Sequence, residues 1–190
     1  MGRENITVIR TNRRTISLEI TSSGQVLVRA PRYMPETEIH AFVESKKSWL
    51  TKHLQKKEKD MELLQEEGRF TEQELKKLTK LAKQIIPEKV SYYARLMGVT
   101  YGRISIRKQK TRWGSCSREG NLNFNCLLMM APPEVLDYVV VHELSHRQEM
   151  NHSVRFWTQV EKVLPDYRKL RRWLKEQGSC LMLRMHGEKK

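Results

Sequence analysis

The sequence predicts an α+β protein, because strand-like and helix-like patterns of apolar residues occupy separate stretches of its 190 residues. Apolar and polar residues alternate over residues 5–31, with the period of a half-buried strand. From Pro35 onward most apolar residues recur at the three- and four-residue spacing of an amphipathic helix. Residues 101–127 return to strand-like patterns before helical spacing resumes. The length suits one domain, or one domain with a small appendage.

The N-terminal stretch has alternating runs on both sides of Ser22-Ser23-Gly24, which is a turn signal. The second run ends at Pro31, which has no N–H to donate within a sheet. These runs predict a small antiparallel sheet over residues 5–31. Its alternating apolar residues are Ile6, Val8, Ile16, Leu18, Ile20, Val26 and Val28.

Helical spacing follows, and Gly68 is placed to end this helical stretch. Its second half, Lys56 to Glu67, is charged and has few apolar residues, which is typical of an exposed connecting helix. We therefore expect a first region over residues 5–68, formed by the N-terminal sheet and a connecting helix.

The next helix is expected to begin at Thr71-Glu72-Gln73-Glu74, which is a capping box. Pro87 is expected to kink or restart this helix, and Gly98 is expected to end it. Residues 101–109 then predict a strand, and residues 112–127 predict a hairpin.

Three further helices are expected after the hairpin. Pro132-Pro133 begins the first, Ser153 caps the second, and the last is a basic helix over residues 166–177. We expect a second region over residues 71–180 and a poorly ordered tail over residues 181–190.

The net charge is +14 and the isoelectric point is about 9.9, so the composition favours polyanionic partners such as nucleic acid or nucleotides. A solvated, lysine-rich surface explains the same charge, because the basic residues are spread along the chain. No apolar run is long enough to span a bilayer, and the N-terminus lacks a signal-peptide pattern. Three cysteines without CxxC spacing predict free thiols, and we expect a cytoplasmic protein.

The segment His142-Glu143-Leu144-Ser145-His146 lies within the helix expected after Pro133. Two histidines four residues apart project from one helical face, so both imidazoles can bind one metal ion. Glu143 is close enough to hold a metal-bound water and to take its proton. The segment therefore predicts a metal-dependent hydrolase.

Zinc requires a third protein ligand while one position stays open for water. His152 lies six residues after His146, and a chain turn between them would bring it to the metal. Glu161 is the alternative ligand. Metzincin proteases have the same histidine spacing, but Glu149 stands where they have glycine, so the turn must follow a different backbone route. The expected zinc ligands are His142, His146 and His152, with Glu143 as the catalytic base.

Several short motifs of the chain recur together in one known family. They are Arg13-Arg14, Val28-Arg29-Ala30-Pro31, Trp49, Thr111-Arg112-Trp113-Gly114-Ser115-Cys116-Ser117, Phe124-Asn125, residues 136–146, Asn151-His152-Ser153, Phe156-Trp157 and Pro165-Asp166-Tyr167. On these motifs the chain resembles the YgjP-like family of metal-dependent hydrolases, which are related to the SprT and WLM metalloproteases. The resemblance extends over nearly the whole chain, with Ser145 and Arg147 as minor departures where the family often has Cys and Leu.

The resemblance implies a zincin-like catalytic core, in which a short antiparallel sheet packs beside the zinc helix. It also implies that the hairpin at residues 112–127 lies next to the active-site cleft. In zincins an edge strand pairs with an extended peptide substrate. Trp113 and Asn125 either line this cleft or serve core packing and turn chemistry.

Other polar residues near the motif have weaker claims to a role. Arg112 and Tyr167 are candidates for contact with the transition state, whereas Tyr138 is expected to pack. Asp137 and Asp166 are candidates to orient a ligand histidine, and helix capping is the simpler role for Asp166.

Three functions are consistent with these patterns. The leading one is a zinc metallopeptidase, in which Glu143 activates water and passes the proton to the leaving nitrogen of a peptide. A second keeps the metal site but hydrolyses a phosphoanhydride in a nucleotide, which the basic charge would attract. A third is a nucleic-acid-associated protease or binding module of the SprT type.

Overall fold

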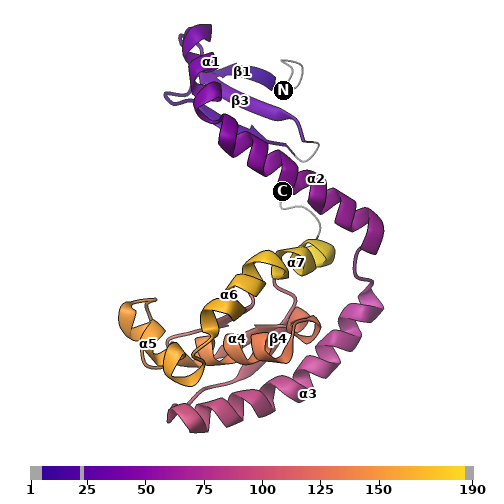
Figure 1. Cartoon of the computed structure of the whole chain (residues 1–190), viewed down its shortest axis with the longest axis vertical. Helices are drawn as coiled ribbons and strands as arrows, with labels where there is room; N and C mark the ends of the chain where they lie inside the picture. Colours follow the sequence, from indigo (N-terminus) through magenta and orange to yellow (C-terminus); the bar gives the residue numbers. More distant parts are fainter. Residues whose placement is uncertain (1–5, 22–23, 187–190) are drawn as a thin grey trace. The chain divides into compact units, whose positions relative to one another are not determined.

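The computed structural model describes residues 6–21 and 24–186, which belong to two compact units (Figure 1). The first unit comprises Met1–Glu67 with Glu188–Lys190, and the second comprises Gly68–Gly187. The α+β fold class is confirmed, because each unit combines a three-stranded sheet with helices. Among the helices in the described ranges, none has the length and apolar character needed to cross a membrane.

The sheet of the first unit is mixed rather than antiparallel. It consists of β1 (Ile6–Thr11), β2 (Ser17–Ile20) and β3 (Val26–Pro31), in the order β1-β3-β2. β2 pairs antiparallel with β3, but β1 pairs parallel with it. The prediction of an antiparallel sheet is therefore wrong for β1. Alternation shows which face of a strand is buried, but not which strand lies beside it or in which direction that strand runs.

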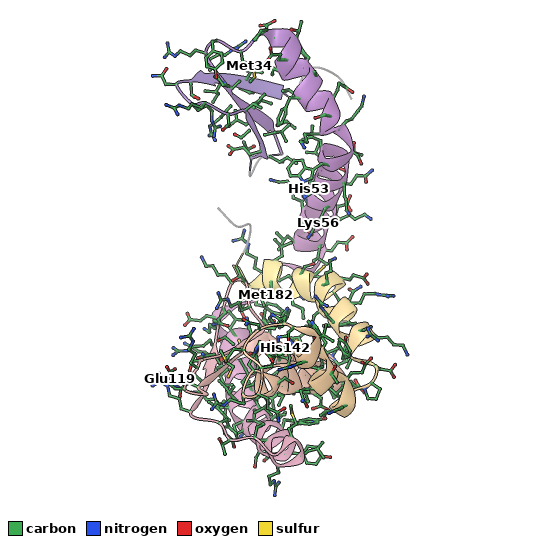
Figure 2. The ribbon with its side chains drawn as sticks, turned by 90° about the vertical axis from the view of Figure 1, so that its left-hand side faces the viewer. Met34, His53, Lys56, Glu119, His142 and Met182 are labelled. Carbon is green, nitrogen blue, oxygen red and sulfur yellow. The ribbon has the colours of Figure 1, made fainter. Side chains whose placement is uncertain are left out.

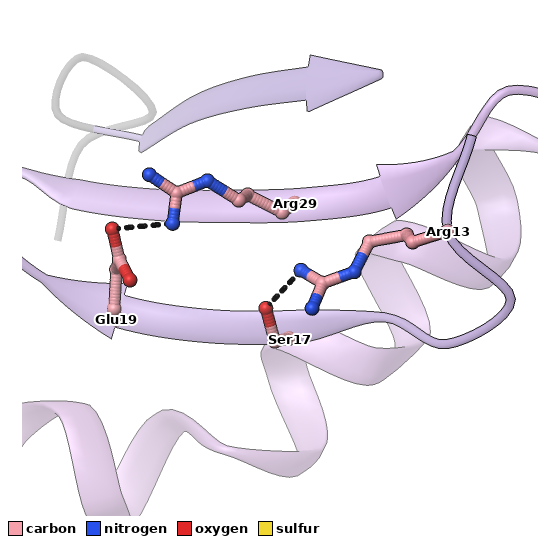
Figure 3. Close-up of polar contacts among 4 residues, drawn as sticks. All are labelled: Arg13, Ser17, Glu19 and Arg29. Atoms are coloured by element: carbon pink, nitrogen blue, oxygen red, sulfur yellow. Dashed lines mark hydrogen bonds and ion pairs between the residues drawn. The ribbon is translucent and has the colours of Figure 1, made fainter. Parts of the chain in front are cut away.

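Polar contacts reinforce the antiparallel side of this sheet (Figure 3). Nη1 of Arg29 on β3 lies 2.8 Å from Oε1 of Glu19 on β2. Arg13 donates a hydrogen bond to Oγ of Ser17 at the start of β2. The Arg29–Glu19 pair is half-exposed, so its contribution to stability is at most about 1 kcal/mol.

Two helices follow the sheet of the first unit. α1 (Glu36–Ser45) packs the buried Ile39 against Val28 and Ala30, and Met34 adds to the edge of this small core (Figure 2). Leu50 is the one buried residue of α2 (Lys47–Glu67), which is the burial expected of an exposed connecting helix.

The second unit begins with α3 (Glu72–Met97), whose ends match the sequence signals. Thr71 accepts a hydrogen bond from the backbone N–H of Glu74, and the Glu74 carboxylate accepts one from the N–H of Thr71 at 2.7 Å. Gly98 ends the helix in the left-handed region, with φ 65°. The helix continues through Pro87, so the expected restart there is wrong. Ile86 and Val90 on either side are fully buried, and their packing holds the helix together across the missing hydrogen bond.

The sheet of the second unit is also mixed. It contains β4 (Ile104–Arg107), β5 (Gly114–Cys116) and β6 (Leu122–Asn125), in the order β4-β6-β5. β5 and β6 form the predicted antiparallel hairpin, whereas β4 runs parallel to β6. The expectation of an antiparallel core sheet is therefore wrong for β4. The order leaves β5 at an edge of the sheet.

One hydrophobic core joins this sheet to the remaining helices. These are the 3₁₀-helix η2 (Cys126–Met130), α4 (Pro133–Ser145), α5 (Val154–Val163), α6 (Tyr167–Glu176) and α7 (Gly178–His186). The largest fully buried side chains of this core include Ile86, Leu122, Phe124, Leu127, Leu128, Leu144 and Phe156.

The predicted tail over residues 181–190 is wrong for residues 181–186, which belong to α7. Leu181, Met182 and Met185 pack on the core, and Met182 is labelled in Figure 2. The backbone N–H of Phe70 donates to the carbonyl of Arg184 at 3.1 Å. A terminal position alone suggested disorder, whereas apolar packing and this hydrogen bond order the segment. Residues 187–190 lie outside the described part of the chain.

Candidate metal centre and active site

The two motif histidines lie at the C-terminal end of α4, a helix surrounded by core. Its residues Val140, Val141 and Leu144 are fully buried, so the helix axis is fixed by packing. His142 and Glu143 lie in the last turn, and His146 is the C-cap residue. The chain then turns, and Ser153 caps α5 by accepting a hydrogen bond from the N–H of Phe156 at 3.3 Å.

The structure brings His142, His146 and His152 together. One ligand nitrogen from each lies within 4.8 Å of the others, and Nε2 of His142 is 3.1 Å from Nε2 of His152. His142 is labelled in Figure 2. The alternative ligand, Glu161, forms an ion pair with Arg168 at 2.9 Å instead. The geometry therefore favours His152 as the third member of the cluster.

The turn between His146 and His152 needs no glycine. In the described ranges no residue other than glycine has a positive φ, so Glu149 fits the turn without backbone strain. The carbonyl of Glu149 lies 3.2 Å from Nδ1 of His146, and accepting a hydrogen bond from Nδ1–H would leave the Nε2 lone pair for the cluster. The chain therefore reaches His152 through a turn that does not need the glycine found at this position in metzincins.

Electrostatics favour the neutral form of two imidazoles of the cluster, those of His142 and His146. Burial, with the charges of His146 and His152 as further causes, lowers the pKa of His142 to about 3. Burial also lowers the pKa of His146. A neutral imidazole presents a lone pair that can bind a cation, and one ring nitrogen from each of the three histidines lies within 4.8 Å of the others. The donor set therefore fits a metal ion.

The aromatic ring of Phe156 packs against all three histidines of the cluster. The ring of Phe156 is fully buried, and its centroid lies 4.9 Å from that of His142, 4.6 Å from that of His146 and 4.7 Å from that of His152. Nδ1 of His142 is buried and has no hydrogen-bond partner among the described residues. On the Nδ1 side the orientation of His142 is thus set by ring packing rather than by a hydrogen bond.

Glu143 lies one residue from His142 and is nearly buried, with 5% of its surface exposed. Burial raises its pKa to about 8, although the charge of Arg112 acts in the opposite direction. A carboxyl group whose pKa is raised to near neutral is suited to accept and release a proton.

Gly114 on β5 is a site residue whose role sequence reasoning missed. A Cβ atom at this position would lie 2.5 Å from Oε1 and 2.7 Å from Cγ of Glu143. Only glycine therefore allows the β5 backbone to approach the carboxylate this closely. A single glycine inside a strand is a known signal of close backbone approach, and the Trp113-Gly114-Ser115 motif carried that signal.

Comparison with known proteins identifies the family of this chain. The model of the YgjP-like metallopeptidase domain matches residues 14–76 and 63–177, which is most of the chain. The chain belongs to the YgjP-like family. Membership of this family supports the function of a metal-dependent peptidase. No protein of curated function matches it.

Two solved structures resemble about half of this YgjP-like chain. The metallopeptidase zymogen of Pyrococcus abyssi abylysin is 24% identical with a TM-score of 0.45, over 49% of this chain and 96% of that one. The metallopeptidase zymogen of Methanocaldococcus jannaschii jannalysin is 19% identical with a TM-score of 0.44, over 48% of this chain and 95% of that one.

Trp113 and Asn125 of the YgjP-like motifs serve packing and turn chemistry. Nδ2 of the buried Asn125 donates to the carbonyls of Gln109 at 2.8 Å and Arg112 at 3.1 Å. Its Oδ1 accepts from the N–H of Leu127 at 3.1 Å. The ring of Trp113 packs against Gly178, where a Cβ would lie 2.7 Å from Cζ2. Both side chains therefore fix the loop that leads into β5.

Asp137 and Asp166 have partners other than the ligand histidines. Asp137 forms an ion pair with Lys89 of α3 at 2.8 Å. Asp166 forms one with Lys169 at 3.1 Å and makes no side-chain hydrogen bond that caps α6, so the expected capping is wrong. The partner of Asp137 lies on α3, far from it in the sequence, so sequence alone could not exclude Asp137 as the partner of a ligand histidine.

An aromatic stack extends the site toward α6. The Trp157 ring stacks on His152 at 5.7 Å and on Tyr167 at 5.3 Å. Tyr138 packs edge-on against His142 at 5.8 Å, and burial raises its pKa to about 12. Tyr138 and Tyr167 are each only 4% exposed, which favours packing over substrate contact for both.

Arg147, which follows α4, connects this helix to the β5–β6 hairpin through hydrogen bonds. Its Nε donates to the carbonyl of Thr100 at 3.0 Å, and its Nη1 donates to that of Arg118 at 2.9 Å. Gly120 lies against the guanidinium, where a Cβ would be 2.7 Å from Cζ. The residue directly after His146 therefore holds the β5–β6 turn beside α4, a role that sequence reasoning did not predict.

Proposed function

We propose that this YgjP-like protein is a zinc metallopeptidase with His142, His146 and His152 as zinc ligands. The observation that supports it best is the convergence of three imidazole nitrogens within 4.8 Å of one another. The buried Glu143 directly follows one of these histidines, His142. Three nitrogen ligands with an open fourth position are a common donor set of catalytic zinc. When bound, zinc would polarise the scissile carbonyl and lower the pKa of water.

Glu143 acts in this proposal as general base and then as general acid. Its carboxylate takes a proton from the attacking water and later delivers that proton to the leaving nitrogen. Its low exposure, 5%, keeps bulk water from competing for the proton between these steps. The contact with Gly114 fixes the carboxylate against β5, so the base has one preferred position.

β5 is the element that would align a peptide with Glu143. It pairs with β6 on one side, and no second strand pairs with it among the described residues. An extended substrate added to such an edge gains backbone hydrogen bonds regardless of its side chains. Because Gly114 contacts Glu143, a peptide along β5 would lie near the base.

The peptide bond is preferred to the other two substrates considered from the sequence. The YgjP-like metallopeptidase match favours peptide hydrolysis over hydrolysis of a nucleotide phosphoanhydride. The basic charge, which suggested nucleotides and nucleic acid, is compatible with a peptidase whose substrates are acidic.

Metal analysis of three purified variants tests the site. His152→Ala is expected to lose zinc, because two imidazoles hold zinc far more weakly than three. Glu143→Gln is expected to keep zinc and to lose about 10²- to 10⁴-fold in the rate of peptide hydrolysis. His40→Ala is the matched control, since His40 is exposed on α1 and should keep both zinc and activity.

Two results would contradict the proposal. Full hydrolytic activity in Glu143→Gln would remove Glu143 as the base. Stoichiometric zinc in His152→Ala would remove His152 from the ligand set and return attention to Glu161.

A further inference from the structure

Arg171 on α6 lies beside the histidine cluster. Its guanidinium carbon is 4.6 Å from the centroid of the Trp157 ring. That ring in turn lies 5.7 Å from His152 and 5.8 Å from His142. The Trp157 ring therefore contacts both the Arg171 guanidinium and two of the proposed zinc ligands, and stacking limits the orientations that the planar guanidinium can take.

Arg171 has no acidic partner within the described part of the chain. Two of its basic neighbours on α6 do have one: Arg168 pairs with Glu161 at 2.9 Å, and Lys169 pairs with Asp166 at 3.1 Å. Arg171 is exposed and is absent from the ion pairs and hydrogen bonds of the described residues. An exposed, oriented cation without a counter-ion beside a catalytic site is suited to bind an anionic group of the substrate.

We propose that this site selects peptides with an acidic side chain close to the scissile bond, with Arg171 as the specificity-determining residue. The inference rests on the proposed peptidase function and names its substrate class. A guanidinium held by stacking can bind a carboxylate through two parallel hydrogen bonds, which a lysine cannot reproduce.

An acidic peptide fits these observations better than nucleic acid does. Nucleic-acid binding of this kind uses several cations that follow a phosphate backbone. Arg171 contributes one guanidinium held by stacking on Trp157, which suits a single carboxylate better than a run of phosphates.

The test begins with the zinc-loaded full-length chain and a peptide library prepared from a proteome. Mass spectrometry of the products is expected to show Asp or Glu enriched within two positions of the cleaved bonds. The preferred sequence is then made as a pair of quenched fluorescent peptides, one acidic and one with Asn or Gln in place of Asp or Glu.

Arg171→Gln is compared with Arg172→Gln, which removes the same charge from the neighbouring exposed position. Arg171→Gln is expected to lower kcat/KM about three- to fivefold for the acidic peptide, mainly through KM, and to leave the neutral peptide unchanged. Arg172→Gln should leave both unchanged. Arg171→Glu is expected to reverse the preference toward a peptide with Lys at the same position, a reversal that a structural role would not produce.

Binding supplies a readout that does not depend on turnover. In the Glu143→Gln background, fluorescence anisotropy with the labelled acidic peptide should show the same three- to fivefold weakening on adding Arg171→Gln. Equal preference for the two peptides in the unmodified chain would overturn the inference and leave the peptidase function intact. Tighter binding of single-stranded DNA than of the acidic peptide, lost in Arg171→Gln, would overturn it in favour of nucleic acid. Absence of cleavage of any peptide by zinc-loaded protein would remove the peptidase function itself.

Discussion

The two units differ in how much core they have, and the proposed chemistry lies in the one with more. The first unit buries Val28, Ala30 and Ile39 as its central cluster, whereas the second has a continuous core from α3 through α7. Three ligands and a base drawn from α4 and the start of α5 stay in place only if their supports are packed. The first unit, a small sheet with a polar helix, lacks such support. The proposed site therefore lies in the unit with the larger core.

Truncation of a buried core side chain is expected to give the largest difference between the two units, in stability and in zinc binding. Phe156→Ala and Ile39→Ala each remove a buried side chain, and each should cost on the order of 2–5 kcal/mol in the stability of its own unit. Because the Phe156 ring contacts all three histidines, its loss should also weaken zinc binding by at least about tenfold. Ile39→Ala should leave zinc affinity unchanged.

Competition with a chelator measures zinc affinity, and thermal unfolding measures stability for the same two variants. Phe156→Leu is the matched control, since it keeps most of the apolar volume and should retain most of the affinity. Equal zinc affinity in Phe156→Ala and Ile39→Ala would show that the ring does not support the cluster.

Sequence reasoning succeeded where a single residue carries a local physical reason. The Thr71–Glu74 capping box and the left-handed Gly98 mark both ends of α3, and each acts through hydrogen bonds to the backbone within one turn. The His142–His146 spacing is likewise a property of helix geometry alone. These features need no knowledge of the tertiary structure.

Features that depend on distant neighbours could not be predicted in this way. The parallel pairing of β1 with β3 and of β4 with β6 depends on how the chain returns to a sheet. The order of α7 depends on the core surface that it covers. The role of Gly114 depends on Glu143, which is far along the chain but contacts β5. Burial alternation and caps contain no information about these long-range contacts.

A smaller effect within the second unit is expected from Gly114→Ala. The new methyl group would overlap the Glu143 carboxylate, so either β5 or Glu143 must move, at a cost of about 1–3 kcal/mol. Displacing the base should lower kcat with little change in zinc content. Chemical denaturation and steady-state kinetics measure the two effects.

A double-mutant cycle gives the control for that overlap. In the Glu143→Ala background the space beside β5 is empty, so adding Gly114→Ala should cost much less stability than it does alone. Equal costs in the two backgrounds would mean that Gly114 is required for the strand itself rather than for its contact with the base.

The smallest effect is expected from removing the first unit. All three proposed ligands, Glu143 and Gly114 lie within Gly68–Gly187, and the core that supports them is formed within that unit. A chain of residues 68–190 should therefore bind zinc within about twofold of the full chain, as isothermal titration calorimetry would measure. Loss of zinc binding in this fragment would show that the second unit does not support its own site. Retained zinc with altered peptide preference would assign the first unit a part in selecting substrates, because the metal centre does not need it.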